Sequence, residues 1–137
     1  MDDGFAWLEE DHRAIEEQFQ TFLRDEEPPV LRELCEHLTR HTQMEEAALY
    51  PALRRYVDGG DDLADRAQQE HATIATMVAA LYDSATPERI TDLVTELHGA
   101  VAGHVEEEES ELFPAMRSCG VDAAALAGEL QGTRSTQ

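Results

Sequence analysis

The chain has 137 residues, a length that suits one domain with a substantial core. Its formal net charge of −20 argues against nucleic acid or an anionic membrane surface as a partner. No apolar stretch is long enough to cross a bilayer, and the acidic N-terminus lacks the basic character of a signal or transit peptide. The two cysteines, Cys35 and Cys119, are far apart, which indicates buried thiols rather than a disulfide. We therefore expect a cytoplasmic protein.

The composition is rich in Ala, Leu and Glu, which favours an all-α fold. The spacing of apolar residues predicts four long helices, at about 5–24, 29–53, 63–81 and 90–115. A short fifth helix follows at about 121–131, and the tail to residue 137 is expected to fray. Short connections force neighbouring helices to run antiparallel. The sequence thus predicts one domain over 1–137, in which an up-down-up-down antiparallel four-helix bundle spans about 5–117 and residues 121–137 form the short C-terminal helix and tail.

A repeated segment carries the chemistry. HTQMEEAALYP, which begins at His41, returns sixty-three residues later as HVEEEESELFP, which begins at His104. On a helix, a histidine and a glutamate four residues later share one face, so His41/Glu45 and His104/Glu108 are two imidazole–carboxylate units. Two such units that face each other in a bundle are typical of a dinuclear metal site.

Two further histidines reach the same layer of the bundle. His12 and His71 lie on the apolar faces of the first and third helices, so each helix contributes one imidazole. Each buried polar group without a partner costs on the order of 2 kcal/mol or more, and a buried carboxylate costs more still. A cation that binds all of these groups is the better interpretation. Nitrogen and carboxylate donors without thiolate favour two octahedral irons, although manganese or zinc could compete.

The sequence resembles the hemerythrin-like (HHE cation-binding) family. The resemblance rests on the DH pair at His12, the HxxxE with LYP at His41, the EH pair at His71 and the HxxxE with LFP at His104. It implies a non-haem pair of iron ions with an oxo or hydroxo bridge that binds O2, H2O2 or NO. By the same resemblance, the iron ligands fall into three pairs: His12 and His41 on one iron, His71 and His104 on the other, and Glu45 and Glu108 as bridges. No catalytic residue beyond these ligands and no organic cofactor is expected.

One position departs from the oxygen-carrying hemerythrins, which have a second histidine one turn after the third-helix histidine. Here that residue is Ala75, so the site is expected to be one imidazole short. Tyr50, Glu46 and Glu109 are the candidates to fill the gap. We favour core packing for Tyr50, because Phe113 replaces it in the other copy of the repeat, and solvated surface positions for Glu46 and Glu109.

Other polar residues near the predicted ligands receive weaker interpretations. Glu16 lies one turn after His12 and is expected at the surface or behind the ligands, and His37 is either a partner of the site, a spare ligand or a partly exposed residue. Pro51 and Pro114 are expected to kink or end their helices. The spacing leaves open whether Tyr50 or His37 contacts metal.

Two classes of function follow from an iron pair with open coordination positions. The first is an oxidoreductase that decomposes hydrogen peroxide, as a catalase or peroxidase does, or that reduces nitric oxide. The alternative is O2 or NO binding, sensing or iron storage without turnover. The expected partners are therefore small molecules, and no redox partner can be named from the sequence.

Overall fold

The computed structural model describes residues 3–83 and 86–135, and within these ranges it contains helices and short turns but no strand. The helical segments are, in chain order, α1 (Gly4–Asp25), α2 (Pro28–Met44), η1 (Glu45–Leu49), α3 (Tyr50–Tyr56), α4 (Gly60–Tyr82), α5 (Pro87–Glu107), η2 (Glu108–Leu112), α6 (Phe113–Ser118) and α7 (Ala123–Ser135). The segments η1 and η2 are single turns of π-helix, and each continues directly into the α-helix that follows.

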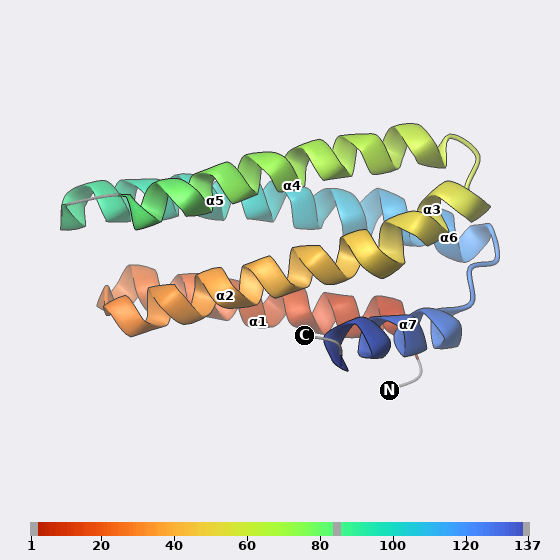
Figure 1. Cartoon of the computed structure of the whole chain (residues 1–137), viewed down its shortest axis with the longest axis horizontal. Helices are drawn as coiled ribbons and strands as arrows, with labels where there is room; N and C mark the ends of the chain where they lie inside the picture. Colours follow the sequence, from red (N-terminus) through yellow and green to blue (C-terminus); the bar gives the residue numbers. More distant parts are fainter. Residues whose placement is uncertain (1–2, 84–85, 136–137) are drawn as a thin grey trace.

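The long segments form four rods (Figure 1), made by α1, by α2–η1–α3, by α4 and by α5–η2–α6. Successive rods run antiparallel, and the most extensive packing joins α1 to α2 and α4 to α5. This confirms the predicted all-α bundle with a short C-terminal helix. The molecule therefore consists of two helical hairpins, α1/α2 and α4/α5, that pack on each other.

Local chemistry defines the ends of the rods. The Asp3 carboxylate caps α1 by accepting hydrogen bonds from the backbone N–H groups of Phe5 (2.9 Å) and Ala6 (3.1 Å). Pro28 begins α2. A backbone N–H at this position has no partner within the helix, so a proline, which lacks the N–H, costs no hydrogen bond here. At the start of α4, a Cβ on Gly60 would lie 2.1 Å from the Leu53 carbonyl oxygen, so only glycine fits this close turn.

The apolar core is divided into two clusters. One cluster surrounds α3, α6 and α7 and includes Phe5, Leu53 and Phe113. The other fills the opposite half of the bundle and includes Phe19 and Leu97. Between them lies a buried polar layer made by His12, His41, Glu45, His71, His104 and Glu108. The fold therefore places charged and polar side chains at its centre, where water cannot solvate them.

Helix α7 packs on the outside of the bundle, as expected. It lies against α1 and η1 and buries Leu126 and Leu130 (Figure 1). A Cβ on Gly4 would come within 2.7 Å of Leu126 Cγ, so the glycine permits this close approach. The helix continues to Ser135, beyond the predicted end at residue 131. Residues 136 and 137 of the predicted tail lie outside the described ranges.

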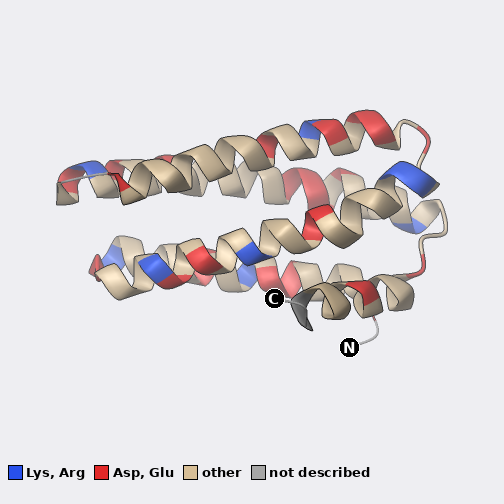
Figure 2. Cartoon of the chain, in the orientation of Figure 1, with Lys and Arg blue, Asp and Glu red and all other residues tan. Residues whose placement is uncertain are grey.

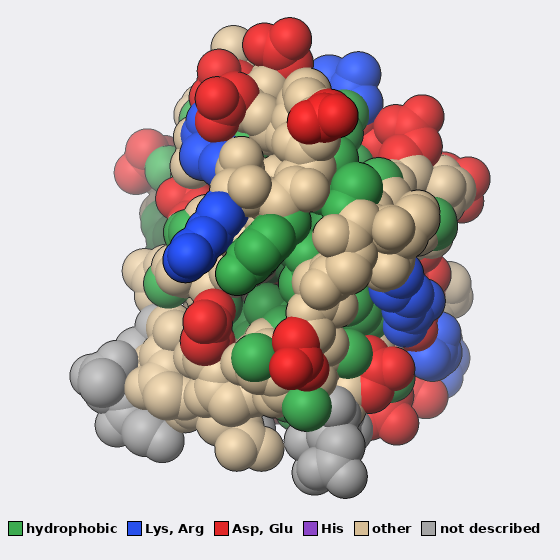
Figure 3. All heavy atoms as spheres, turned by 90° about the vertical axis from the view of Figure 1, so that its right-hand side faces the viewer, with side chains coloured by type: hydrophobic (Ala, Val, Ile, Leu, Met, Phe, Trp, Pro, Cys, Tyr) green, Lys and Arg blue, Asp and Glu red, His purple; other side chains and the backbone are tan. Residues whose placement is uncertain are grey.

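The surface is strongly acidic, with Asp and Glu along the rods and few basic residues (Figure 2). At the end where α3 and α6 finish, hydrophobic side chains occupy the middle of the face and no histidine is visible (Figure 3). No helix in the described part of the chain is both long enough and apolar enough to cross a membrane. Cys35 is buried as expected, whereas Cys119 is exposed, because it follows the last turn of α6 and faces solvent.

Candidate metal centre

The six residues predicted as ligands meet in the polar layer. The histidines come from α1, α2, α4 and α5, and the two glutamates begin the π turns η1 and η2. Their donor atoms form two groups, each with all atoms within 4.8 Å of one another, that could hold metal ions: His12, His41, Glu45 and Glu108, and Glu45, His71, His104 and Glu108. Glu45 and Glu108 belong to both groups, which is the arrangement expected of bridging carboxylates.

The π turns shape the layer. The backbone N–H of Tyr50 bonds the carbonyl of Glu45, and that of Phe113 bonds the carbonyl of Glu108, five residues back in each case. In an α-helix the fifth residue points away from the first, but the wider π turn returns the two aromatic rings to the face of the glutamates. Such single π turns occur mostly at functional sites.

The prolines that follow the aromatic residues do not end the helices, so that part of the expectation was wrong. Pro51 and Pro114 lie in the first turns of α3 and α6, directly after the π turns. A proline inside a helix loses the bond to the carbonyl four residues back and crowds that carbonyl. The wider turn ahead of each proline relieves both problems, and the helix continues.

At the centre of the first group, four polar atoms have no hydrogen-bond partner. His12 Nε2, His41 Nε2, Glu45 Oε2 and Glu108 Oε1 are buried and make no hydrogen bond. His12 Nε2 lies 3.1 Å from Glu108 Oε1, and His41 Nε2 lies 3.1 Å from Glu45 Oε2, but neither pair has hydrogen-bond geometry. Four inward-facing lone-pair atoms without partners are costly in a protein interior. A cation among them would remove that cost.

The second group contains a phenol. The Tyr50 hydroxyl donates a hydrogen bond to Glu108 Oε2 (2.9 Å) and lies 3.0 Å from His71 Nε2 and 3.4 Å from His104 Nε2. Tyr50 is buried in the apolar core, as favoured from the sequence, but its oxygen also points into the cluster. A regular α-helix would direct this side chain elsewhere, and the π turn brings it to the face of the glutamates.

A carboxylate also holds the outer nitrogen of every histidine in the layer. The Nδ1 contacts are His41 with Asp11 (2.6 Å), His12 with Glu109 (2.7 Å), His71 with Glu46 (2.9 Å) and His104 with Glu70 (2.6 Å). Such carboxylates fix the tautomer of a metal-binding histidine and leave Nε2 free for the metal. Glu46 and Glu109 are exposed and partly exposed, in line with the expected surface positions, but each also ends on an imidazole, which was not expected.

These contacts follow an internal two-fold pattern. In each half of the chain the acidic residue before the first histidine binds the second histidine of the same half, as Asp11 does with His41 and Glu70 with His104. The acidic residue after each bridging glutamate binds the first histidine of the other half. The sequence signal was present, because an acidic residue stands at all four of these places, but it was not interpreted as a pattern.

The remaining histidines behave differently. His37 is half-buried and contacts Asp11 through Nε2 (2.7 Å) and Gln18 through Nδ1 (2.7 Å), so it supports the residue that holds His41 and does not reach the cluster itself. Glu16 turns away from His12 and contacts His98 (2.8 Å). Of the alternatives left open, His37 is thus a partly exposed residue that contacts a partner of the site, and Glu16 lies at the surface.

Protons compensate part of the buried charge in the metal-free protein. Burial disfavours the imidazolium forms, but the Glu108 and Glu45 carboxylates outweigh it and raise the pKa of His12 to about 10 and that of His104 to about 12. Burial alone would raise the pKa of Glu45, yet the positive charge of His41 holds that pKa well below its usual range. Burial, followed by the charges of Glu45 and Glu108, raises the pKa of the Tyr50 phenol, so the phenol stays protonated without a metal.

Comparison with known proteins places this geometry in a family. A relative called "DNA nickase" from Nostoc sp. (strain PCC 7120 / SAG 25.82 / UTEX 2576) is 33% identical over 114 residues, which is 79% of this chain and 32% of the relative. The chain thus spans about a third of the length of this curated relative. No solved structure matches the chain. Residues 3–116, which carry all six clustered residues, match the family described as the hemerythrin HHE cation binding domain, and the chain belongs to this family.

Proposed function

We propose that the chain holds two iron ions in the polar layer. His12 and His41 hold one ion, His71 and His104 hold the other, and Glu45 and Glu108 bridge them. The unpartnered buried donor atoms of the first group carry this proposal, because one metal ion among them would contact all four. The four outer carboxylates support it, since they direct every Nε2 inward. Nitrogen and oxygen donors without thiolate suit iron, and manganese or zinc would compete.

We further propose that Tyr50 serves the ion held by His71 and His104. Its oxygen lies 3.0 Å from His71 Nε2 and 3.4 Å from His104 Nε2, and no other phenol approaches the layer among the described residues. A phenolate oxygen is a hard, anionic donor that favours ferric over ferrous iron. Reversible O2 carriage depends on the ferrous state, so this donor set supports reaction with an oxidant more than carriage.

The function that these groups support best is decomposition of hydrogen peroxide, reduction of nitric oxide, or both. An iron pair would supply the redox equivalents when bound. The chain's own residues exclude water with the two apolar clusters and hold the ligands with the outer carboxylates.

Peroxide and NO consumption at substoichiometric protein tests the proposal. Iron-loaded protein should remove many equivalents of one of these substrates, and metal-free protein should remove none. A single spectral change followed by no further consumption would contradict catalysis.

That last result would support a second candidate, binding or sensing of O2 or NO. The comparison gives this candidate one specific observation: in the longer relative, the similar region covers only 32% of the protein and therefore accompanies further sequence. A domain that binds a gas could act on such neighbouring sequence without turnover.

A further inference from the structure

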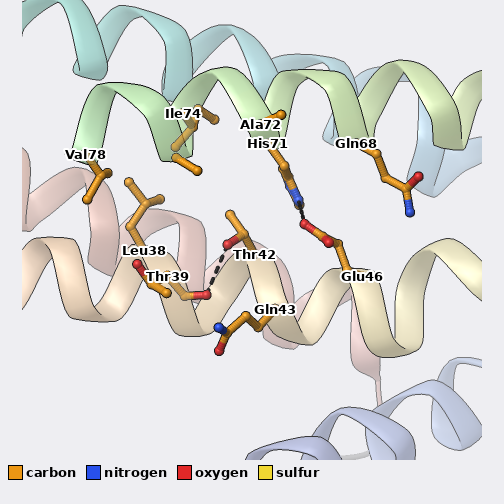
Figure 4. A pocket seen from close by; sticks show the side chains of 11 residues that line it. Leu38, Thr39, Thr42, Gln43, Glu46, Gln68, His71, Ala72, Ile74 and Val78 are labelled. Atoms are coloured by element: carbon orange, nitrogen blue, oxygen red, sulfur yellow. Dashed lines mark hydrogen bonds and ion pairs between the residues drawn. The ribbon is translucent and has the colours of Figure 1, made fainter. Parts of the chain in front are cut away.

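A cavity of 320 Å³ lies between α2 and α4, at one of the two seams that join the helical hairpins. Figure 4 shows the side chains that line it: Leu38, Ile74 and Val78 at one end, and His71 with Glu46 toward the other. Ala75, the residue at the position of the missing histidine, is exposed and forms part of the wall. A water molecule takes about 30 Å³ in the liquid, so the space suffices for several small molecules.

The opposite seam has a matching but different cavity. It lies between α1 and α5, has a volume of 240 Å³, and reaches His12 and Glu109, as the first reaches His71 and Glu46. The two cavities occupy equivalent places in the internal repeat. Their walls can therefore be compared position by position.

The comparison shows that the α2–α4 cavity is the less charged. Ala72 and Ala75 on α4 correspond to Arg13 and Glu16 on α1, so two methyl groups stand where the other seam has two long charged side chains. On the facing helix, Gln43 corresponds to Glu106. The Glu16 carboxylate also contacts His98 on α5 (2.8 Å), and this contact holds the Glu16 side chain across the α1–α5 seam.

The α2–α4 cavity ends one imidazole away from the cluster. The Nδ1 side of His71 meets Glu46 in the cavity (2.9 Å, Figure 4), while the Nε2 side lies 3.0 Å from the Tyr50 hydroxyl. Glu46 is 48% exposed at its side chain, so it can move into solvent without opening the core. A single ring and a partly exposed carboxylate thus separate the cavity from the donor atoms.

We propose that the α2–α4 cavity is the entry for small uncharged ligands such as nitric oxide, and that the charged α1–α5 cavity is not. The inference rests on the proposed function, since it concerns access to the same centre. Ala72 and Ala75 act as specificity-determining residues through their small size. An uncharged diatomic molecule gains contact with the apolar side chains of Leu38, Ile74 and Val78 and loses little hydration on entry.

Phenylalanine at an exposed alanine in the wall of each cavity tests the two seams against each other. Ala75→Phe fills the α2–α4 cavity, and Ala102→Phe places the same side chain in the α1–α5 cavity. In stopped-flow mixing of NO with iron-loaded protein, Ala75→Phe should slow association by about tenfold or more, whereas Ala102→Phe should change it by less than about twofold. Val78→Ala enlarges the first cavity and should accelerate association, which keeps the test decisive if Ala75→Phe folds poorly.

Xenon binding, followed by NMR, gives a second test that requires no metal. In metal-free protein labelled with 15N, xenon should shift the backbone amides of Thr42 and Val78, and Ala75→Phe should abolish these shifts. Equal slowing of NO by both phenylalanine variants, or no effect of Ala75→Phe and Val78→Ala, would overturn the proposal, as would the absence of xenon shifts. Failure to bind iron would instead overturn the proposed function, and the xenon reading distinguishes the two failures.

Discussion

Removal of one oxygen atom by Tyr50→Phe tests how the second group is built. The side chain is fully buried, and its hydroxyl donates to the Glu108 carboxylate at 2.9 Å. A hydrogen bond to a charged group contributes about 1.5–3 kcal/mol, and the variant also leaves a buried carboxylate oxygen without its donor. We therefore expect metal-free Tyr50→Phe to lose about 2 kcal/mol of unfolding free energy, which lowers the urea midpoint by about 1 M.

The same variant has a separate effect on iron-loaded protein. If the phenol oxygen binds iron, the unchanged protein shows a visible phenolate-to-iron absorption band. Tyr50→Phe lacks this band but retains the absorption that comes from the remaining ligands. Tyr82→Phe is the matched control, because Tyr82 is 66% exposed and far from the layer, and it should change neither stability nor spectrum. A Tyr50→Phe protein within about 0.5 kcal/mol of the unchanged chain and with an identical spectrum would refute the reasoning.

Three further predictions concern the ligands and their supports. Glu45→Ala or Glu108→Ala should lower iron content below two per chain and bleach the iron chromophore, and two irons retained in both variants would refute their bridging role. Asp11→Asn should weaken iron binding by about 10–100-fold in a chelator competition, because the His41 ring loses its carboxylate at 2.6 Å, and unchanged affinity would contradict this support. Burial lowers the pKa of His41, but Glu45 and Asp11 outweigh it and raise that pKa from 6.5 to about 9 in the metal-free protein. Proton binding at His41 therefore stabilises the metal-free fold fully below pH 6.5, and this contribution is lost as the pH rises through about 9, as urea unfolding at a series of pH values would show. Stability that rises over that range would have the wrong sign.

The bundle and the six clustered residues could be predicted from the sequence because both depend on regular helical spacing. Apolar residues every three or four positions identify the rods, and a histidine followed by a glutamate four residues later remains on one face whatever the neighbouring helix does. His41/Glu45 and His104/Glu108 repeat this spacing, so an error in one copy would have shown against the other.

The features that the sequence analysis missed depend on departures from that regularity or on contacts between helices. The π turns change which residue faces inward, so the position of the Tyr50 oxygen could not be obtained from α-helical spacing. Glu46 and Glu109 lie on outward-facing positions of their own helices, and their interpretation as surface charges followed from that. Only the packing of the two hairpins brings an imidazole from the other half within 2.9 Å of each carboxylate.

The two halves of the chain are equivalent in their ligands but not in their surroundings. Tyr50 in one half corresponds to Phe113 in the other, and Ala75 on α4 corresponds to Glu16 on α1. The ring of Phe113 stacks parallel to the ring of His12, with 6.1 Å between their centroids. Unlike Tyr50, it carries no hydroxyl group that could reach the cluster. Both differences lie on the side of His71.

The metal content per chain, measured together with the absorption spectrum of protein produced in iron-replete cells, tests the central claim most directly. The account predicts two irons per chain and the spectrum of an oxygen-bridged ferric pair. One metal ion or none, in protein that retains its helical fold, would contradict it.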